Sequence, residues 1–174
     1  GHVGRIISTK LAAHFPRQVI VAGRNQQKAD AFSQETGQKV LPLSLDISRP
    51  DTYDEALTDV SIVVMCLDQK DTRFVEACLR RGVHYVDISA TYNFLSKVES
   101  LDMKAKKNGA TAVISVGLVP GLTNLLAAHA KSQLDGMSQA DVFILLGSGE
   151  AAGEASIRWI LDNLNADFSI RENG

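Results

Sequence analysis

Two glycines three residues apart, Gly1 and Gly4, stand directly before a stretch with the apolar spacing of an amphipathic helix. A glycine has no side chain, so a phosphate can approach its backbone, and the N–H groups at a helix N-terminus bind the phosphate charge. We therefore interpret Gly1, His2, Val3 and Gly4 as the end of a loop that binds the pyrophosphate of a dinucleotide. An ordinary loop before a helix is the alternative, and both stay open on this motif alone.

A pair of cations follows the next apolar run, which covers residues 19–23. Arg24 lies roughly 20 residues past the glycine loop, where dinucleotide sites meet the adenosine ribose. An Asp or Glu at this position binds a free 2′-hydroxyl, whereas this chain has Arg24 with Lys28 one helical turn further on. A guanidinium can bind a phosphate through two hydrogen bonds. The pair predicts a site that prefers NADP(H) over NAD(H); an exposed loop arginine is the alternative.

Residues at the ends of two further apolar runs are candidates for contacts with the rest of the cofactor. Asp46 can accept a hydrogen bond from the adenine amino group, and Ile47 can flank the adenine ring. Cys66 and Leu67 end the next run, where the strand order of such a sheet reverses and ligands bind. Simpler roles are open as well, namely a cap or loop role for Asp46 and plain packing for Cys66.

Two later segments are candidates for catalysis and for the nicotinamide end of the site. Asp87 closes an apolar run, and a carboxylate there can act as an acid or base or orient a substrate ammonium. Capping of the next turn is the alternative. The turn Val119-Pro120-Gly121 precedes a helix whose N-terminus can bind a carboxamide or a carboxylate. A simple turn between domains is the other interpretation.

These candidates are positioned by an alternation of apolar runs and helical stretches. The runs lack strict two-residue alternation, as expected of strands covered on both faces, and they cover 18–23, 39–46, 61–68, 84–89 and 111–117. The helical stretches cover 5–14, 26–36, 51–57, 72–81 and 94–108, and three of them are followed by a glycine suited to a helix C-cap, Gly37, Gly82 and Gly109. The order predicts an α/β fold with a doubly wound parallel sheet of Rossmann type.

One strand of that sheet is expected before Gly1, because a doubly wound sheet has the strand before its glycine loop at the centre. We expect the given chain to begin just after that strand, as part of a longer protein. After Gly117 the pattern changes, and a helix over 123–134, a strand over 140–147 and a helix over 154–164 are predicted. We therefore divide the chain into a dinucleotide-binding domain, 1–134, and the truncated beginning of a second domain, 135–174.

The composition makes several other classes of protein poor candidates. A formal net charge of −2 without basic runs is not the footprint of a nucleic-acid or anionic-membrane binder. No apolar run reaches the roughly 18 residues of a membrane span. The two cysteines, Cys66 and Cys78, lack the spacing of a metal site or a disulfide framework. We expect them to be free thiols in a reducing compartment and the protein to be cytoplasmic.

Four stretches together resemble the saccharopine dehydrogenase-like NADP-dependent oxidoreductases: GHVG, AGRNQQKA, ACLRRGVHYVDIS and GLVPGLTN. A fifth, GEASIRWILDNL, resembles the start of that family's second domain. The resemblance implies a Rossmann-type domain and a separate α+β domain that binds substrate and helps to form a homodimer. It also places the phosphate site at Arg24 and Asn25, and the crevice at Asp87 and the 119–122 turn.

The activity that the resemblance implies is hydride transfer at the C–N bond of an amino-acid-derived secondary amine or imine, with Asp87 as a candidate acid or base. An enoyl reductase of the same family and a non-catalytic NADP(H)-binding sensor are the alternatives. The chain departs from the family pattern at two places. The first glycine of the loop is absent, and Cys66-Leu67-Asp68 stands where many members have an Ala-Gly-Pro-like turn.

Overall fold

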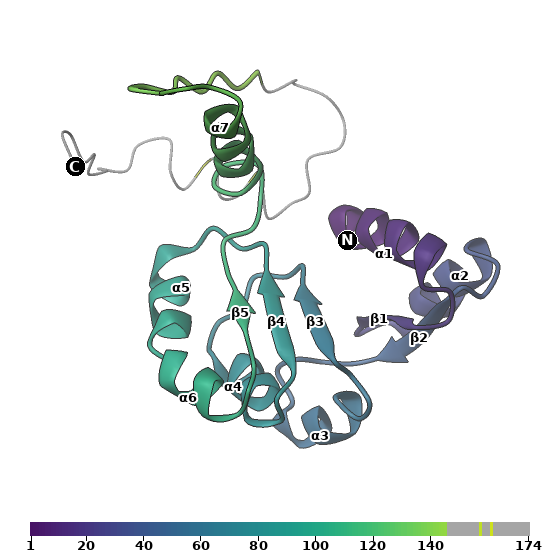
Figure 1. The fold of residues 1–174 in the computed structure, drawn as a ribbon. Helices are drawn as coiled ribbons and strands as arrows, with labels where there is room; N and C mark the ends of the chain where they lie inside the picture. The colour runs from purple at the N-terminus through teal and green to yellow at the C-terminus, as the bar shows by residue number, and fades with distance from the viewer. Residues whose placement is uncertain (146–156, 158–160, 162–174) are drawn as a thin grey trace.

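The computed structural model describes residues 1–145 together with residues 157 and 161. Parallel strands alternate with helices along the chain (Figure 1), which confirms the α/β class. In chain order the elements are α1 (His2–His14), β1 (Val19–Gly23), α2 (Gln26–Glu35), β2 (Val40–Ser44), the 3-10 helix η1 (Pro50–Thr52), α3 (Tyr53–Ala56), β3 (Ile62–Met65), α4 (Arg73–Arg80), β4 (His84–Asp87), α5 (Tyr92–Glu99), α6 (Asp102–Lys107), β5 (Ala112–Val113) and α7 (Leu122–Ser132).

The strands form two separate parallel sheets, β1–β2 and β3–β4–β5. Val19 pairs with Val40 in the first sheet, and Met65 of β3 lies opposite Asp87 of β4 in the second. No backbone ladder joins β1 to β3 within the part of the chain that the structure describes. Figure 1 shows the β1–β2 pair on the β3 side of the larger sheet.

Most buried apolar side chains pack on the larger sheet. Helix α4 supplies one face of this core, and Phe74 meets the ring of Tyr53 edge to face, with 4.9 Å between ring centroids. Tyr85 of β4 is fully buried in the same cluster. The smaller sheet has a separate cluster that consists of Ala12, Phe32 and Val40, with two partly buried valines of β1 beside it.

The structure departs from the sequence-based expectations at three places. The helix expected over 94–108 is two helices, α5 and α6. The last strand, β5, ends at Val113 because Ser115 adopts a positive φ of 58°, which turns the chain. The strand expected over 140–147 is wrong for 140–145, which no described strand pairs with. An extended segment without a partner leaves its backbone groups unsatisfied. The remainder of that strand and nearly all of the 154–164 helix lie outside the described residues.

Candidate functional site

Helix α1 begins at the predicted phosphate loop. Gly1 is its N-cap, no side chain caps this end, and the first turn contains no acidic residue. Such an end leaves backbone N–H groups that can bind an anion. A methyl group added at Gly4 would lie 3.7 Å from Cβ of Cys66, so the first turn of α1 packs directly against the residue that follows β3. His2, Val3 and Gly4, which the sequence analysis assigned to a loop, thus form the first turn of α1, and Gly4 lies beside Cys66.

The predicted 2′-phosphate ligands lie at the carboxyl end of β1. Arg24 and Lys28 are exposed, and neither forms an ion pair with another residue of 1–145. Asn25 is the N-cap of α2, and its Oδ1 accepts a hydrogen bond of 3.0 Å from the backbone N–H of Lys28. This cap fixes the start of α2, so the two cations stand at a defined helix N-terminus, where an anion is favoured.

Asp46 lies two residues after the end of β2, where the positive charge of Arg24 acts on its carboxyl group. The Asp46 Oδ1 accepts hydrogen bonds from the backbone N–H and the hydroxyl of Ser48, at 2.9 and 2.8 Å. These bonds, and more weakly the charge of Arg24, lower the pKa of Asp46. The carbonyl of Ile47 accepts a 2.5 Å hydrogen bond from the Tyr53 hydroxyl, which ties this loop to the core. The loop role of Asp46 is thereby confirmed, and its contact with adenine stays a prediction.

The two cysteines are unsuited to nucleophilic chemistry. Cys66 is half-buried, and burial raises the pKa of its thiol. Cys78 is fully buried in the larger core, where burial raises its pKa to about 12. A protonated thiol is a poor nucleophile. Leu67, beside Cys66, is 51% exposed. The geometry favours a packing role for Cys66 and leaves its predicted contact with nicotinamide untested.

Asp87 is the centre of a buried polar network at the carboxyl end of β4. Its side chain is fully buried, and it accepts hydrogen bonds from the Tyr85 hydroxyl (2.5 Å), the Ser89 backbone N–H (2.6 Å) and Gln69 Nε2 (3.3 Å). Burial, and then the bond to Asp87, raises the pKa of Tyr85, which therefore keeps its proton. The bond from Ser89 is the turn cap expected as the alternative. A carboxylate without solvent access is placed to orient its neighbours, and its role as an acid or base stays a prediction.

Gln69 is a site residue that sequence reasoning missed. It lies in the loop between β3 and α4, and its Nε2 also donates a 2.6 Å hydrogen bond to the Tyr85 hydroxyl. A glutamine among exposed loop residues has no distinguishing pattern. Its position at the carboxyl end of a strand next to β4 was the one available signal.

The turn before α7 has a conformation that requires glycine. Gly121 has a φ of 129°, and a Cβ there would lie 2.3 Å from the carbonyl oxygen of Gly117. The Gly121 N–H donates to Asn124 Oδ1 at 3.0 Å. Val119 and Pro120, joined by a cis peptide bond, are exposed on this turn. Figure 1 shows α7 beyond the arrowheads of β3 and β4, so the turn lies at the same end of the sheet as Asp87.

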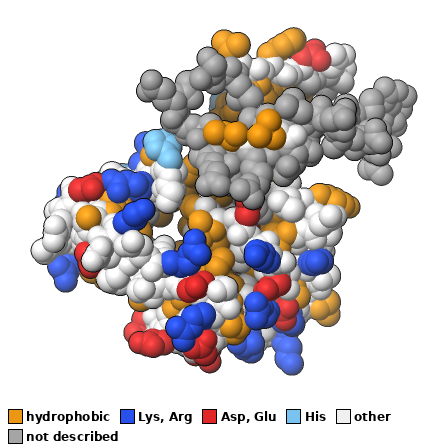
Figure 2. Space-filling model, turned by 180° about the vertical axis from the view of Figure 1, so that it is seen from behind, with side chains coloured by type: hydrophobic (Ala, Val, Ile, Leu, Met, Phe, Trp, Pro, Cys, Tyr) orange, Lys and Arg blue, Asp and Glu red, His pale blue; other side chains and the backbone are white. Residues whose placement is uncertain are grey.

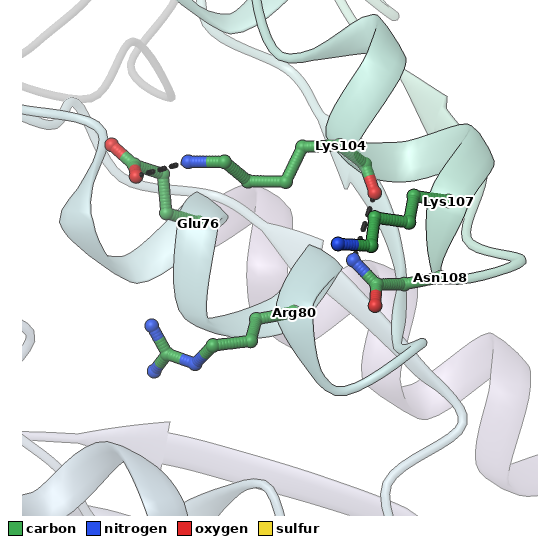
Figure 3. Close-up of a pocket in the computed structure, with 5 residues that line it drawn as sticks. All are labelled: Glu76, Arg80, Lys104, Lys107 and Asn108. Carbon is green, nitrogen blue, oxygen red and sulfur yellow. Dashed lines mark hydrogen bonds and ion pairs between the residues drawn. The ribbon is translucent and has the colours of Figure 1, made fainter.

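One surface hollow lies away from these residues. It has a volume of about 250 Å³ and lies between α4 and α6 (Figure 3), lined by Glu76, Arg80, Lys104, Lys107 and Asn108. A 2.7 Å ion pair between Lys104 and Glu76 crosses it. Figure 2 shows acidic and basic side chains interleaved around the same sheet rather than gathered by sign. We interpret the hollow as the groove where α4 and α6 pack together, bridged by an ion pair, and not as a ligand site.

Two further features of the described residues bear on the kind of site. They contain no group of three His, Cys, Asp or Glu side chains arranged to bind a metal ion. None of the helices in this part of the chain has the length and apolar character needed to cross a membrane.

Comparison with known proteins relates this chain to one enzyme family. The family model described as the saccharopine dehydrogenase NADP binding domain matches residues 1–113. The carboxyaminopropylagmatine dehydrogenase of Synechocystis sp. is 26% identical over 185 residues, covering 99% of this chain and 45% of the relative. The apo structure of saccharopine dehydrogenase (L-Glu forming) from Saccharomyces cerevisiae matches with a TM-score of 0.63 and 25% identity, covering 76% of this chain and 29% of that one. The chain thus spans less than half the length of either relative.

Proposed function

This chain belongs to the saccharopine dehydrogenase NADP-binding domain family, and on that premise we propose that it is the cofactor-binding part of an NADP(H)-dependent oxidoreductase. The observation that carries the proposal is the pair Arg24 and Lys28, two exposed cations without an ion-pair partner in the described chain, at the N-terminus of α2. Arginine suits a phosphate because its planar fork can donate two hydrogen bonds at once. We assign Arg24 as the principal ligand of the 2′-phosphate, with Lys28 as a second charge.

We assign the pyrophosphate, the adenine and the nicotinamide of the cofactor to three other segments. The N-terminus of α1 binds the pyrophosphate, and Gly4 allows this helix to lie against the end of β3. Asp46, held by Ser48, accepts from the adenine amino group through its remaining oxygen, and Ile47 flanks the ring. The 119–121 turn and Cys66–Leu67 border the nicotinamide end. The nicotinamide, when bound, supplies the hydride chemistry.

We further propose that the substrate is an amino-acid-derived secondary amine or imine. The names of the two relatives, carboxyaminopropylagmatine dehydrogenase and saccharopine dehydrogenase, support this class. An amine must be uncharged before hydride leaves its carbon, so the reaction needs a base near that nitrogen. Asp87 is fully buried, and we therefore give it an orienting role. Substrate binding and homodimer formation by the second domain stay predictions.

The first experiment is calorimetric titration of the full-length protein with NADPH and NADH. We expect NADPH to bind at least about tenfold more tightly, about 1.4 kcal/mol. Arg24→Ala is expected to remove most of this difference, while Lys107→Ala, an exposed lysine on α6, leaves it unchanged. Equal affinity for the two nucleotides would overturn the NADP(H) preference. Absence of binding to either one would overturn the proposed function as a whole.

A substrate screen then distinguishes the remaining candidates. Oxidation of NADPH with a pair of carbonyl and amino-acid substrates that condense to an imine supports the proposed reaction. Oxidation with an unsaturated lipid instead indicates an enoyl reductase. Tight NADPH binding without oxidation by either class indicates a sensor.

A further inference from the structure

The loop from residue 66 to residue 72 leaves the carboxyl end of β3 and leads into α4. Leu67, Asp68 and Lys70 are exposed, whereas Gln69 is half-buried and turned toward β4. Gln69 Nε2 donates to the Tyr85 hydroxyl at 2.6 Å and to Asp87 Oδ2 at 3.3 Å. Among the described residues, these are the hydrogen bonds that connect residues 67–72 to β4. One side chain therefore holds the middle of this loop, whose neighbouring residues are exposed, onto the sheet.

This polar arrangement is poorly explained by stability alone. Gln69 Oε1 and Ser89 Oγ are both buried, and no described residue donates a hydrogen bond to either. A buried acceptor left without a partner is destabilising, and an apolar side chain of similar size would avoid that penalty. The amide is nevertheless placed so that it reaches both Tyr85 and the Asp87 carboxylate. A residue that maintains geometry at the expense of stability has the character of a positioning residue.

The clamped loop borders the segments assigned to the cofactor. Cys66, at its start, lies against Gly4 in the first turn of α1. On the other side of the network, the backbone carbonyl of Asp87 accepts a 2.9 Å hydrogen bond from the N–H of Val116, immediately before the glycine turn. The loop thus meets the phosphate-binding turn through Cys66 and the glycine turn through Asp87, so a displaced loop would disturb both segments.

We propose that Gln69 is a positioning residue for cofactor binding: its amide clamps the 66–72 loop to Tyr85 and Asp87 and so sets the affinity for NADP(H) without touching the nucleotide. This inference rests on the proposed function. It assigns to a loop residue a role that acts through the buried carboxylate and not through the ligand.

The first test is Gln69→Leu in the full-length protein, with NADPH affinity measured by calorimetry and the thermal midpoint by differential scanning. We expect NADPH to bind about tenfold more weakly, within the range of couplings between contacting residues, while the thermal midpoint changes little, because the loss of the two bonds to Tyr85 and Asp87 is offset by removal of the unsatisfied buried Gln69 Oε1. Gln34→Leu, an exposed glutamine near the end of α2, is the matched control and is expected to change neither quantity. Unchanged NADPH affinity in Gln69→Leu would overturn the proposal.

An exchange of the two side-chain types provides the sharper test. Gln69→Glu places two carboxylates together and is expected to weaken NADPH binding more than Gln69→Leu, since like charges repel. In the double variant with Asp87→Asn, the carboxylate is at position 69 and the amide at position 87. The Tyr85 hydroxyl can then donate to the carboxylate and accept from the amide. We expect the double variant to return to within about threefold of the wild-type affinity. A double variant as weak as Gln69→Glu would show that Gln69 acts on the nucleotide directly and would overturn the proposal.

The failures of the two proposals are distinguishable. A wild-type protein that binds neither nucleotide removes the proposed function and this inference with it. A wild-type protein that binds NADPH, beside a Gln69→Leu variant of equal affinity, removes this inference alone.

Discussion

The two sheets of the molecule differ sharply in how they are supported. The β3–β4–β5 sheet packs in a cluster of sixteen buried residues, whereas the β1–β2 sheet has three, Ala12, Phe32 and Val40. The exposed cations assigned to the cofactor phosphate lie on the smaller unit, and the buried Asp87 network lies on the larger one. The comparison indicates that the residues assigned to the 2′-phosphate lie on the half with the smaller core, and the buried polar network lies on the half with the larger one.

Among the described strands, each sheet also has an edge strand with one neighbour only, β1 in the smaller sheet and β3 in the larger one. Strands β1 and β3 each lack a second neighbour in the described structure, and their apolar residues Ile20 and Ile62 are 44% and 54% exposed. An apolar edge with unpaired backbone groups is suited to accept another strand. Both edges are therefore placed to accept a further strand, and the central strand expected from the fold class stays a prediction.

The largest effect is expected from truncating one aromatic residue in each core, which tests whether the two cores differ in packing. Phe74→Ala is expected to lower the free energy of unfolding by about 3–5 kcal/mol, because a large side chain is removed from a closely packed core. Phe32→Ala, in the smaller cluster, is expected to cost about 2–3 kcal/mol, since fewer neighbours surround it. Urea denaturation measures both. An equal or larger loss for Phe32→Ala would refute the difference in packing.

The second prediction concerns the strand that would join the sheets. In the full-length protein, a strand of ~5–6 residues that pairs with both edges is expected to protect backbone amides of β1 and β3 relative to this chain. Their hydrogen exchange should slow about a hundredfold, or about 3 kcal/mol of local stability, while exchange in α4 changes little. If β1 and β3 exchange equally fast in both chain lengths, the strand does not lie between them.

Tyr85→Phe tests how much the buried polar network contributes to the stability of the larger half. The change removes one hydroxyl and leaves both the Asp87 carboxylate and the Gln69 amide with one partner fewer. We expect a loss of about 1–3 kcal/mol in the free energy of unfolding, because buried polar groups are left unsatisfied. Tyr92→Phe, on an exposed tyrosine, is the control and should have no measurable effect. A Tyr85→Phe variant of wild-type stability would show that the network contributes no net stability.

The smallest expected effect is electrostatic. The bond from Lys104, followed by that from Thr72, lowers the pKa of Glu76 below its usual value of 4.5. The pair therefore stabilises the fold above about pH 4.5, and this contribution is lost as the pH falls through the lower folded value. Both side chains are more than one third exposed, so Lys104→Met should cost at most about 0.5 kcal/mol at pH 7 and nothing near pH 2. A loss that persists at pH 2 would point to packing instead of charge.

Local signals were predictable from the sequence, and long-range partnerships were not. The strand over 19–23 follows from its apolar run, and Gly37, Gly82 and Gly109 adopt the positive φ values expected of helix C-caps. Asp87 was identified from its place at a strand end. The burial of Asp87 could not be predicted, because it depends on contacts with Tyr85 and with Gln69, which lies eighteen residues away in the sequence. The strand over 140–145 failed because an apolar run forms a strand only where a partner pairs with it.

The two thiols allow the opening of each half to be followed in time. Cys78 is fully buried in the larger core with its pKa raised to about 12, so an alkylating reagent reaches a reactive thiolate only when that core opens. Cys66 is half-buried where α1 meets the end of β3, so its alkylation speeds up when that helix detaches. The ratio of the two labelling rates therefore separates detachment of the smaller half from unfolding of the whole molecule.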